Sequence, residues 1–114
     1  MNRQIYRTQN FDEFYNSLNK RTREKADYIF EVIRTQKIVS TKFVKKIINS
    51  DFYELRISVE NEYRVIFFSI DCENFMNANE IILLNGFIKK SVTVYERQIE
   101  IAKKLMEKID YGKD

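Results

Sequence analysis

Hydrophobic and polar positions alternate with two different periods along the chain. The short alternation in residues 3–8, RQIYRT, predicts a first strand. A helical period follows, with Asn10 as the expected N-cap. Its apolar stripe is formed by Phe11, Phe14, Tyr15 and Leu18.

Two further helices are expected from the same spacing. One runs from Lys20 to Lys37 and forms a hairpin with the first, and the other runs from Thr93 to Ile109. The inward positions of the earlier helix are Ala26, Ile29, Phe30 and Ile33. Those of the later helix are Tyr95, Ile99, Ala102, Met106 and Ile109.

Between these helices, a basic connection, STKFVKKIINS, leads into three apolar segments typical of strands, 52–58, 63–70 and 80–88. Polar loops join the three, which predicts an antiparallel meander. The expected fold class is therefore α+β, a single domain over residues 1–114 with its helices on one side of a mainly antiparallel sheet.

Composition narrows the possible chemistry. The net charge of +3 permits an anionic partner without requiring one. Cys72 is the only cysteine, so no intramolecular disulfide is possible, and the lack of histidine removes the commonest zinc ligand and general base. We therefore expect no metal and no cofactor.

The longest apolar runs, VIFF and IILL, are too short to span a bilayer, which predicts a cytoplasmic protein without a membrane partner.

Arg56 and Arg64 stand out because they lie inside apolar strand segments. Whether they share a face of the sheet depends on the turn between the strands. A three-residue loop at 60–62 would pair residue 58 with residue 64 and align the arginines, whereas a two-residue turn would separate them. The odd loop is favoured, because neither Glu60 nor Asn61 is glycine.

More cations flank these strands, and together they could form a concave surface that binds phosphates. The alternative is that the lysines only keep the protein soluble. The seven cations are Lys42, Lys45, Lys46, Arg56, Arg64, Lys89 and Lys90.

Four motifs resemble those of a known family: FYELRI at 52–57, EYRVIFF at 62–68, IILLNGFIKK at 81–90 and ERQIEIAKKL at 96–105. They are similar to the HigB-like branch of the RelE/ParE toxin superfamily. The resemblance implies a RelE-like fold and a bacterial or phage-encoded toxin that cuts messenger RNA during translation on the ribosome. It also implies neutralisation by a cognate helix-turn-helix antitoxin.

The resemblance carries over to particular residues. Arg56 matches the arginine of the family's ELR motif, Arg64 that of YRV, and Lys89 with Lys90 the KK pair. The spacing of Tyr95 resembles that of a catalytic tyrosine. Two departures follow: Asn85 replaces the usual histidine of LLHGF, and the K-T-P sequence that commonly follows KK is absent.

RNA cleavage without a metal requires a base for the 2′-hydroxyl and cations for the phosphorane. Arg64 and Lys89 or Lys90 are expected to clamp the phosphorane oxygens, with Arg56 orienting the phosphate or the leaving group. The base stays open between Glu54, a lysine and a Tyr95 of lowered pKa, and Glu54 has the alternative role of a structural ion pair.

The other lysines, Lys42, Lys45 and Lys46, are expected to contact RNA or the ribosome. Two other functions compete with a metal-independent endoribonuclease. One is a gyrase-binding toxin of the ParE type, and the other is a non-catalytic module that binds an antitoxin or nucleic acid.

Overall fold

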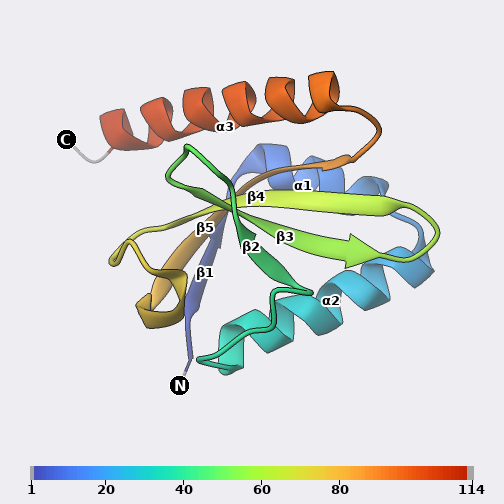
Figure 1. Ribbon diagram of the computed structural model, residues 1–114, viewed down its shortest axis with the longest axis horizontal. Coiled ribbons are helices and arrows are strands. Elements are labelled where there is room, and N and C mark those ends of the chain that lie inside the picture. Colours follow the sequence, from blue (N-terminus) through green and yellow to red (C-terminus); the bar gives the residue numbers. More distant parts are fainter. Residues whose placement is uncertain (1, 113–114) are drawn as a thin grey trace.

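A five-stranded mixed sheet forms the centre of the protein, in a computed structural model that describes residues 2–112 (Figure 1). The expected single domain also includes Met1, Lys113 and Asp114, which lie outside the described residues. The strand order is β1-β5-β4-β3-β2, in which only β1 and β5 pair in parallel. The strands are β1 Gln4–Arg7, β2 Val44–Lys46, β3 Phe52–Ser58, β4 Glu62–Ser69 and β5 Glu80–Ile88.

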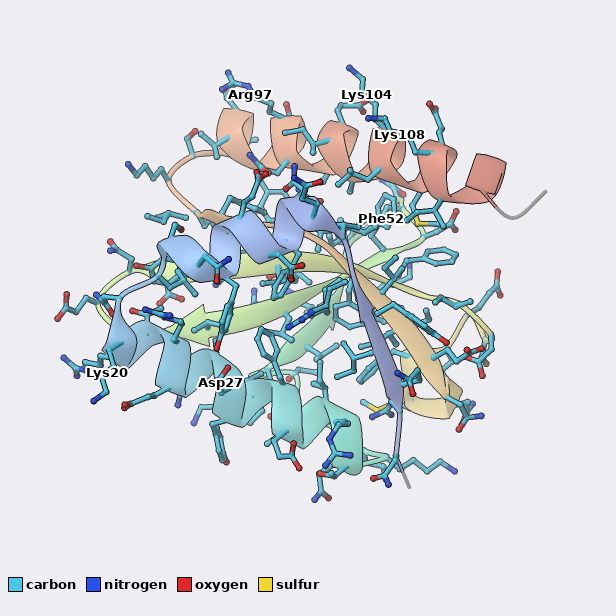
Figure 2. All side chains as sticks on the ribbon, turned by 180° about the vertical axis from the view of Figure 1, so that it is seen from behind. Lys20, Asp27, Phe52, Arg97, Lys104 and Lys108 are labelled. Carbon is cyan, nitrogen blue, oxygen red and sulfur yellow. The ribbon has the colours of Figure 1, made fainter. Side chains whose placement is uncertain are left out.

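Helices cover both faces of this sheet. Figure 1 shows α3 above the sheet and α2 below it, and Figure 2 shows the same two layers from behind. The expectation of helices on one side only is therefore wrong. The physical reason is visible in β4, where both alternating sets include buried apolar side chains, so each face needs a cover. The helices are α1 Gln9–Ser17, α2 Lys20–Thr35 and α3 Val92–Gly112, with a short 3-10 helix η1 at Phe75–Asn77.

Two separate cores result. Phe11, Ile29 and Leu55 belong to the core between α1, α2 and the sheet. Ile66, Leu84 and Ala102 belong to the core beneath α3. The inward stripes expected for α2 and α3 are confirmed, since their members lie in or against these cores.

Most strand and helix boundaries lie close to those expected from the sequence, with differences at α1, α2 and β2. The N-cap of α1 is Thr8 rather than Asn10, because the Thr8 hydroxyl accepts a hydrogen bond from the Phe11 amide. Helix α2 ends at Thr35 instead of Lys37. Strand β2 was not expected at all, since it has three residues and only Val44 is buried.

The turn between β3 and β4 aligns the two arginines as expected. Arg56 lies directly opposite Arg64, so they share one face of the sheet. The pairing of residue 58 with residue 64 is wrong, however, because Ser58 pairs with Glu62 and the three-residue loop is 59–61.

A β-bulge in β5 changes which side chains face α3. Ile66 pairs with Asn85 and the next residue of β4, Phe67, pairs with Leu83, so Leu84 has no partner. Before the bulge Ile82 packs beneath α3, and after it Phe87 does so as well. The extra residue thus reverses which side chains of β5 face α3: even-numbered residues do so before the bulge, and Phe87 does so after it.

Glycine at position 86 allows close packing on the opposite face. A Cβ atom there would lie 2.3 Å from Cδ2 of Phe14, so no larger residue fits while α1 stays in place. The phenyl ring of α1 therefore packs directly on the backbone of β5.

Arg3 ties the amino terminus to the end of α2 and to η1. Its side chain is 2% exposed and has no acidic partner among the described residues. It donates hydrogen bonds to six backbone carbonyls, those of Ile33, Gln36, Lys37, Phe75, Met76 and Ala78. The Ile33 carbonyl belongs to the last turn of α2 and the Gln36 carbonyl to its C-cap, where no helical partner is available.

None of the helices within residues 2–112 combines the length and the apolar character needed to cross a membrane.

Candidate functional site

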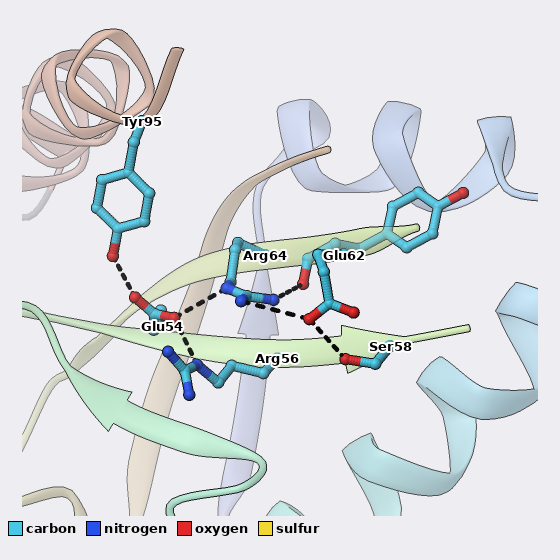
Figure 3. Close-up of polar contacts among 7 residues, drawn as sticks. Glu54, Arg56, Ser58, Glu62, Arg64 and Tyr95 are labelled. Carbon is cyan, nitrogen blue, oxygen red and sulfur yellow. Dashed lines mark hydrogen bonds and ion pairs between the residues drawn. The ribbon is translucent and has the colours of Figure 1, made fainter. Parts of the chain in front are cut away.

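Glu54 lies at the centre of a polar cluster between β3, β4 and the start of α3 (Figure 3). Strand alternation puts Glu54 and Arg56 on the face that α3 covers, and the pairing of β3 with β4 adds Arg64. Tyr95 reaches the same carboxylate from the first turn of α3. The cluster therefore depends on three elements at once.

Both carboxylate oxygens of Glu54 are occupied, and the residue is 5% exposed. The Tyr95 hydroxyl donates a hydrogen bond to Oε1. Arg56 Nε donates a hydrogen bond of 2.8 Å to Oε2, and Arg64 Nε lies 2.9 Å from the same oxygen in an ion pair. Glu54 thus has the geometry of a structural ion pair, the alternative role that its spacing suggested.

Arg64 is enclosed by these contacts and by its own strand. It is 5% exposed, its Nη1 donates to the Tyr63 carbonyl at 3.0 Å, and its Nη2 lies 3.6 Å from Glu62. Arg56 is more open, with 29% of its side chain exposed. The more accessible guanidinium of the pair is therefore Arg56.

The cluster shifts the pKa values of Glu54 and Tyr95 in opposite directions. Burial favours the neutral form of Glu54, but hydrogen bonds from Tyr95 and Arg56, with the charges of Arg56 and Arg64, outweigh it and lower the pKa of this carboxyl. Burial, followed by the hydrogen bond to Glu54, raises the pKa of Tyr95. The expectation of a Tyr95 with lowered pKa is wrong, because its nearest charged partner is a carboxylate.

Lower pH is expected to destabilise the protein through Glu54. Its pKa is lower in the folded chain than the ordinary value of 4.5, so the unfolded chain binds the proton more readily. The stabilisation is complete above pH 4.5 and is lost as pH falls through the lower folded value. Urea unfolding at several pH values checks this: Glu54→Gln should be less stable than the parent at pH 7, and the difference should shrink in acid. A constant difference would contradict it.

Replacement of Arg64 by alanine is expected to destabilise the fold by about 3 kcal/mol, because a buried carboxylate loses one of its two cations. Arg56→Ala removes a more exposed partner and should cost less. Urea unfolding of both variants measures the difference. If both variants lose the same amount of stability, the burial of the arginine does not determine the size of the loss.

A shallow cavity of about 300 Å³ opens beside this cluster. It is lined by Lys45, Lys46, Ile47, Ile48, Glu54, Arg56, Lys89, Tyr95 and Ile99. Lys89 is exposed, and its Nζ lies 5.6 Å from the centre of the Tyr95 ring. The bulge in β5 explains this position, since the switched alternation continues from Phe87 to Lys89.

The remaining expected cations do not direct their charged groups into the cavity, although Lys46 is among its lining residues. Lys42 and Lys90 are exposed but do not line it, and Arg64 lies behind Glu54. The ammonium of Lys46 hydrogen-bonds the Ser50 carbonyl and lies 5.5 Å from the Tyr53 ring, on the other side of β3 from Glu54. Lys45 is paired opposite Glu54. The compact basic set is therefore Lys45, Arg56 and Lys89.

Asn85, at the position of the family's usual histidine, does not line the cavity. It is 1% exposed, and its amide donates to the backbone carbonyl and the side-chain oxygen of Gln98 at 3.1 and 2.9 Å. It therefore links β5 to α3. Within residues 2–112 no group of three His, Cys, Asp or Glu side chains is placed to hold a metal ion.

Three aliphatic members of the cavity, Ile47, Ile48 and Ile99, were not expected as site residues, and Ile47 also belongs to the core beneath α3. Ile99 was assigned only to the apolar stripe of α3, and Ile48 only to the basic connection. A large apolar residue within the polar turn INSD was the one available signal for Ile48.

The sheet topology and the two covering helical layers define the class as the RelE fold. A solved structure of E. coli toxin RelE in the free state, a variant with two arginines replaced by alanine, matches with a TM-score of 0.61. The match covers 88% of this chain and 97% of that one at 12% sequence identity, which shows the fold alone. The expected RelE-like α+β fold is thereby confirmed.

Residues 13–107 match the family described as phage-derived protein Gp49-like (DUF891), and the chain belongs to that family. The match agrees with the expected place in the RelE/ParE superfamily. No curated protein matches the sequence.

Proposed function

We propose that this protein is the toxin of a type II toxin–antitoxin pair, and that it cleaves messenger RNA on translating ribosomes as a HigB-like, metal-independent endoribonuclease. One observation carries the proposal: three cations from β2, β3 and the end of β5 meet around one cavity next to a buried Glu–Tyr pair. The Gp49-like family and the RelE fold support it.

The exposed cations act on the phosphate. Lys89 and Arg56 contact the nonbridging oxygens, and Lys45 holds the neighbouring phosphate of the strand. Fixed cations of this kind stabilise the extra negative charge of the phosphorane more than that of the ground state, which lowers the barrier. Lys42, Lys46 and Lys90 lie outside this set and contact the RNA or the ribosome farther from the scissile bond.

Arg64 acts through Glu54, because its burial prevents direct contact with a phosphate. It fixes the carboxylate, and the carboxylate in turn fixes Arg56 Nε at 2.8 Å. Arg64 is a positioning residue in this scheme, and Glu54 positions Arg56 in addition to its part in proton transfer. An arginine suits the task, since its planar group makes directed contacts that an ammonium cannot reproduce.

Proton transfer uses the Glu54–Tyr95 hydrogen bond. The Tyr95 hydroxyl donates to Glu54, so its oxygen is free to accept the proton of the 2′-hydroxyl while its own proton passes to Glu54. The 2′-oxygen then bonds to phosphorus, the bond to the 5′-oxygen breaks, and the Lys89 ammonium protonates that oxygen. The products are a 2′,3′-cyclic phosphate and a 5′-hydroxyl.

Glu54 is a weak proton acceptor, because its pKa is lowered. A slow proton transfer of this kind fits an enzyme that works on RNA already positioned by the ribosome. The predicted partners follow from this: messenger RNA, the ribosome and a cognate helix-turn-helix antitoxin, all in the cytoplasm.

Induction in cells tests the proposal. The wild-type chain should arrest growth and translation, primer extension on cellular messages should show new 5′ ends within reading frames, and the antitoxin should restore growth. DNA damage linked to gyrase, without new RNA ends, would instead support the ParE-type alternative. Normal growth with abundant folded protein would leave only the non-catalytic alternative.

A further inference from the structure

The cavity beside Glu54 has two chemically different walls. Lys45, Arg56 and Lys89 supply positive charge, whereas Ile48 and Ile99 supply an aliphatic surface. Ile48 is 81% exposed, so the aliphatic wall is open to a ligand. An apolar surface directly next to cations matches the two parts of a nucleotide, a flat base and a charged phosphate.

The turn that carries Ile48 is well fixed by hydrogen bonds. The Ile47 amide donates to the Phe52 carbonyl at 3.0 Å, and the Ser50 hydroxyl donates to the Ile47 carbonyl at 2.9 Å. Asn49 adopts a left-handed conformation with φ of 61°, which asparagine tolerates better than most residues. The turn therefore presents Ile48 to solvent in a defined position.

Resting on the function proposed above, we propose that Ile48 and Ile99 form a seat for the base of the nucleotide whose phosphate is held by Lys45, Arg56 and Lys89. The seat takes an unpaired base, because one face of the ring must lie against the isoleucines. Aliphatic side chains offer no hydrogen bonds, so the contact holds any base and selects single-stranded RNA over a duplex.

Methyl NMR tests the seat without requiring cleavage. Full-length protein labelled at the isoleucine methyl groups and at backbone amides is titrated with adenosine 3′-monophosphate and, separately, with inorganic phosphate. The Ile48 and Ile99 methyl signals should shift with the nucleotide only, whereas the Lys89 amide should shift with both ligands. Ile38 is the internal control, since it is also 81% exposed but does not line the cavity.

Two matched variants measure how much Ile48 contributes to nucleotide binding. Ile48→Ser should weaken binding of the nucleotide roughly five- to tenfold, through loss of apolar contact, and leave binding of inorganic phosphate unchanged. Ile38→Ser should change neither. Because both side chains point into solvent, neither substitution is expected to disturb the fold.

The outcomes separate the seat from the proposed function. A Lys89 response to both ligands with silent Ile48 and Ile99 methyl groups would overturn the seat and keep the phosphate site. No response to either ligand would overturn both. Parent-like nucleotide binding by Ile48→Ser would also overturn the seat.

Discussion

Lys89→Ala is expected to remove about 99% of the cleavage activity while the protein stays folded. Lys89 is exposed and lines the cavity, so the loss of its ammonium removes one preorganised contact to the phosphorane, worth about 3 kcal/mol of barrier. The hydrogen bond of 2.8 Å from the Lys89 amide to the Glu62 carbonyl belongs to the backbone and survives in the variant. Cleavage rates of the purified parent and variant measure the effect.

The neighbouring Lys90 provides the control. It is also exposed but does not line the cavity. Lys90→Ala should therefore keep most of the activity. If the two variants lose activity equally, the effect comes from general charge at the end of β5 and not from a defined phosphate contact.

Arg3→Met is expected to give the largest loss of stability, about 4 kcal/mol in the free energy of unfolding. Methionine fills similar space but donates no hydrogen bonds, so the six carbonyls that Arg3 contacts lose a buried partner. The contact of the guanidinium with the Phe75 ring, 4.1 Å from its centre, is lost as well. Urea unfolding at neutral pH measures the change.

Arg7→Met is the matched control for this experiment. The Arg7 side chain is 57% exposed and forms only a surface ion pair of 3.3 Å with Asp12, so its loss should cost less than about 0.5 kcal/mol. A loss below about 1 kcal/mol for Arg3→Met would show that water replaces the missing donors.

The strands and helices could be predicted because their apolar periods are long and clear. The meander and α3 are examples, and strands 52–58 and 80–88 match β3 and β5. The sequence also indicates that both faces of the sheet are covered by helices, since β4 carries apolar residues in both alternating positions. The order of elements alone does not reveal this cover, because it says nothing about which faces of β4 are buried.

The site was only partly predictable. Alternation placed Glu54, Arg56 and Arg64 on one face, and the odd loop aligned them. The bulge that turns Lys89 toward Tyr95 leaves no local signal, because an extra residue in a strand depends on pairing with its neighbour. The enclosure of Arg64 likewise depends on its contacts with Glu54 and Glu62, which no local pattern reveals.

One measurement tests the central proposal most directly. A defined message is translated in a reconstituted system with purified protein, and the ends of the RNA fragments are analysed chemically. The wild-type protein should cut the translated message and leave 2′,3′-cyclic phosphate and 5′-hydroxyl ends, while Lys89→Ala at the same concentration leaves it intact. An intact message with the wild-type protein, in a system where the same preparation inhibits DNA supercoiling by gyrase, would contradict the ribonuclease proposal.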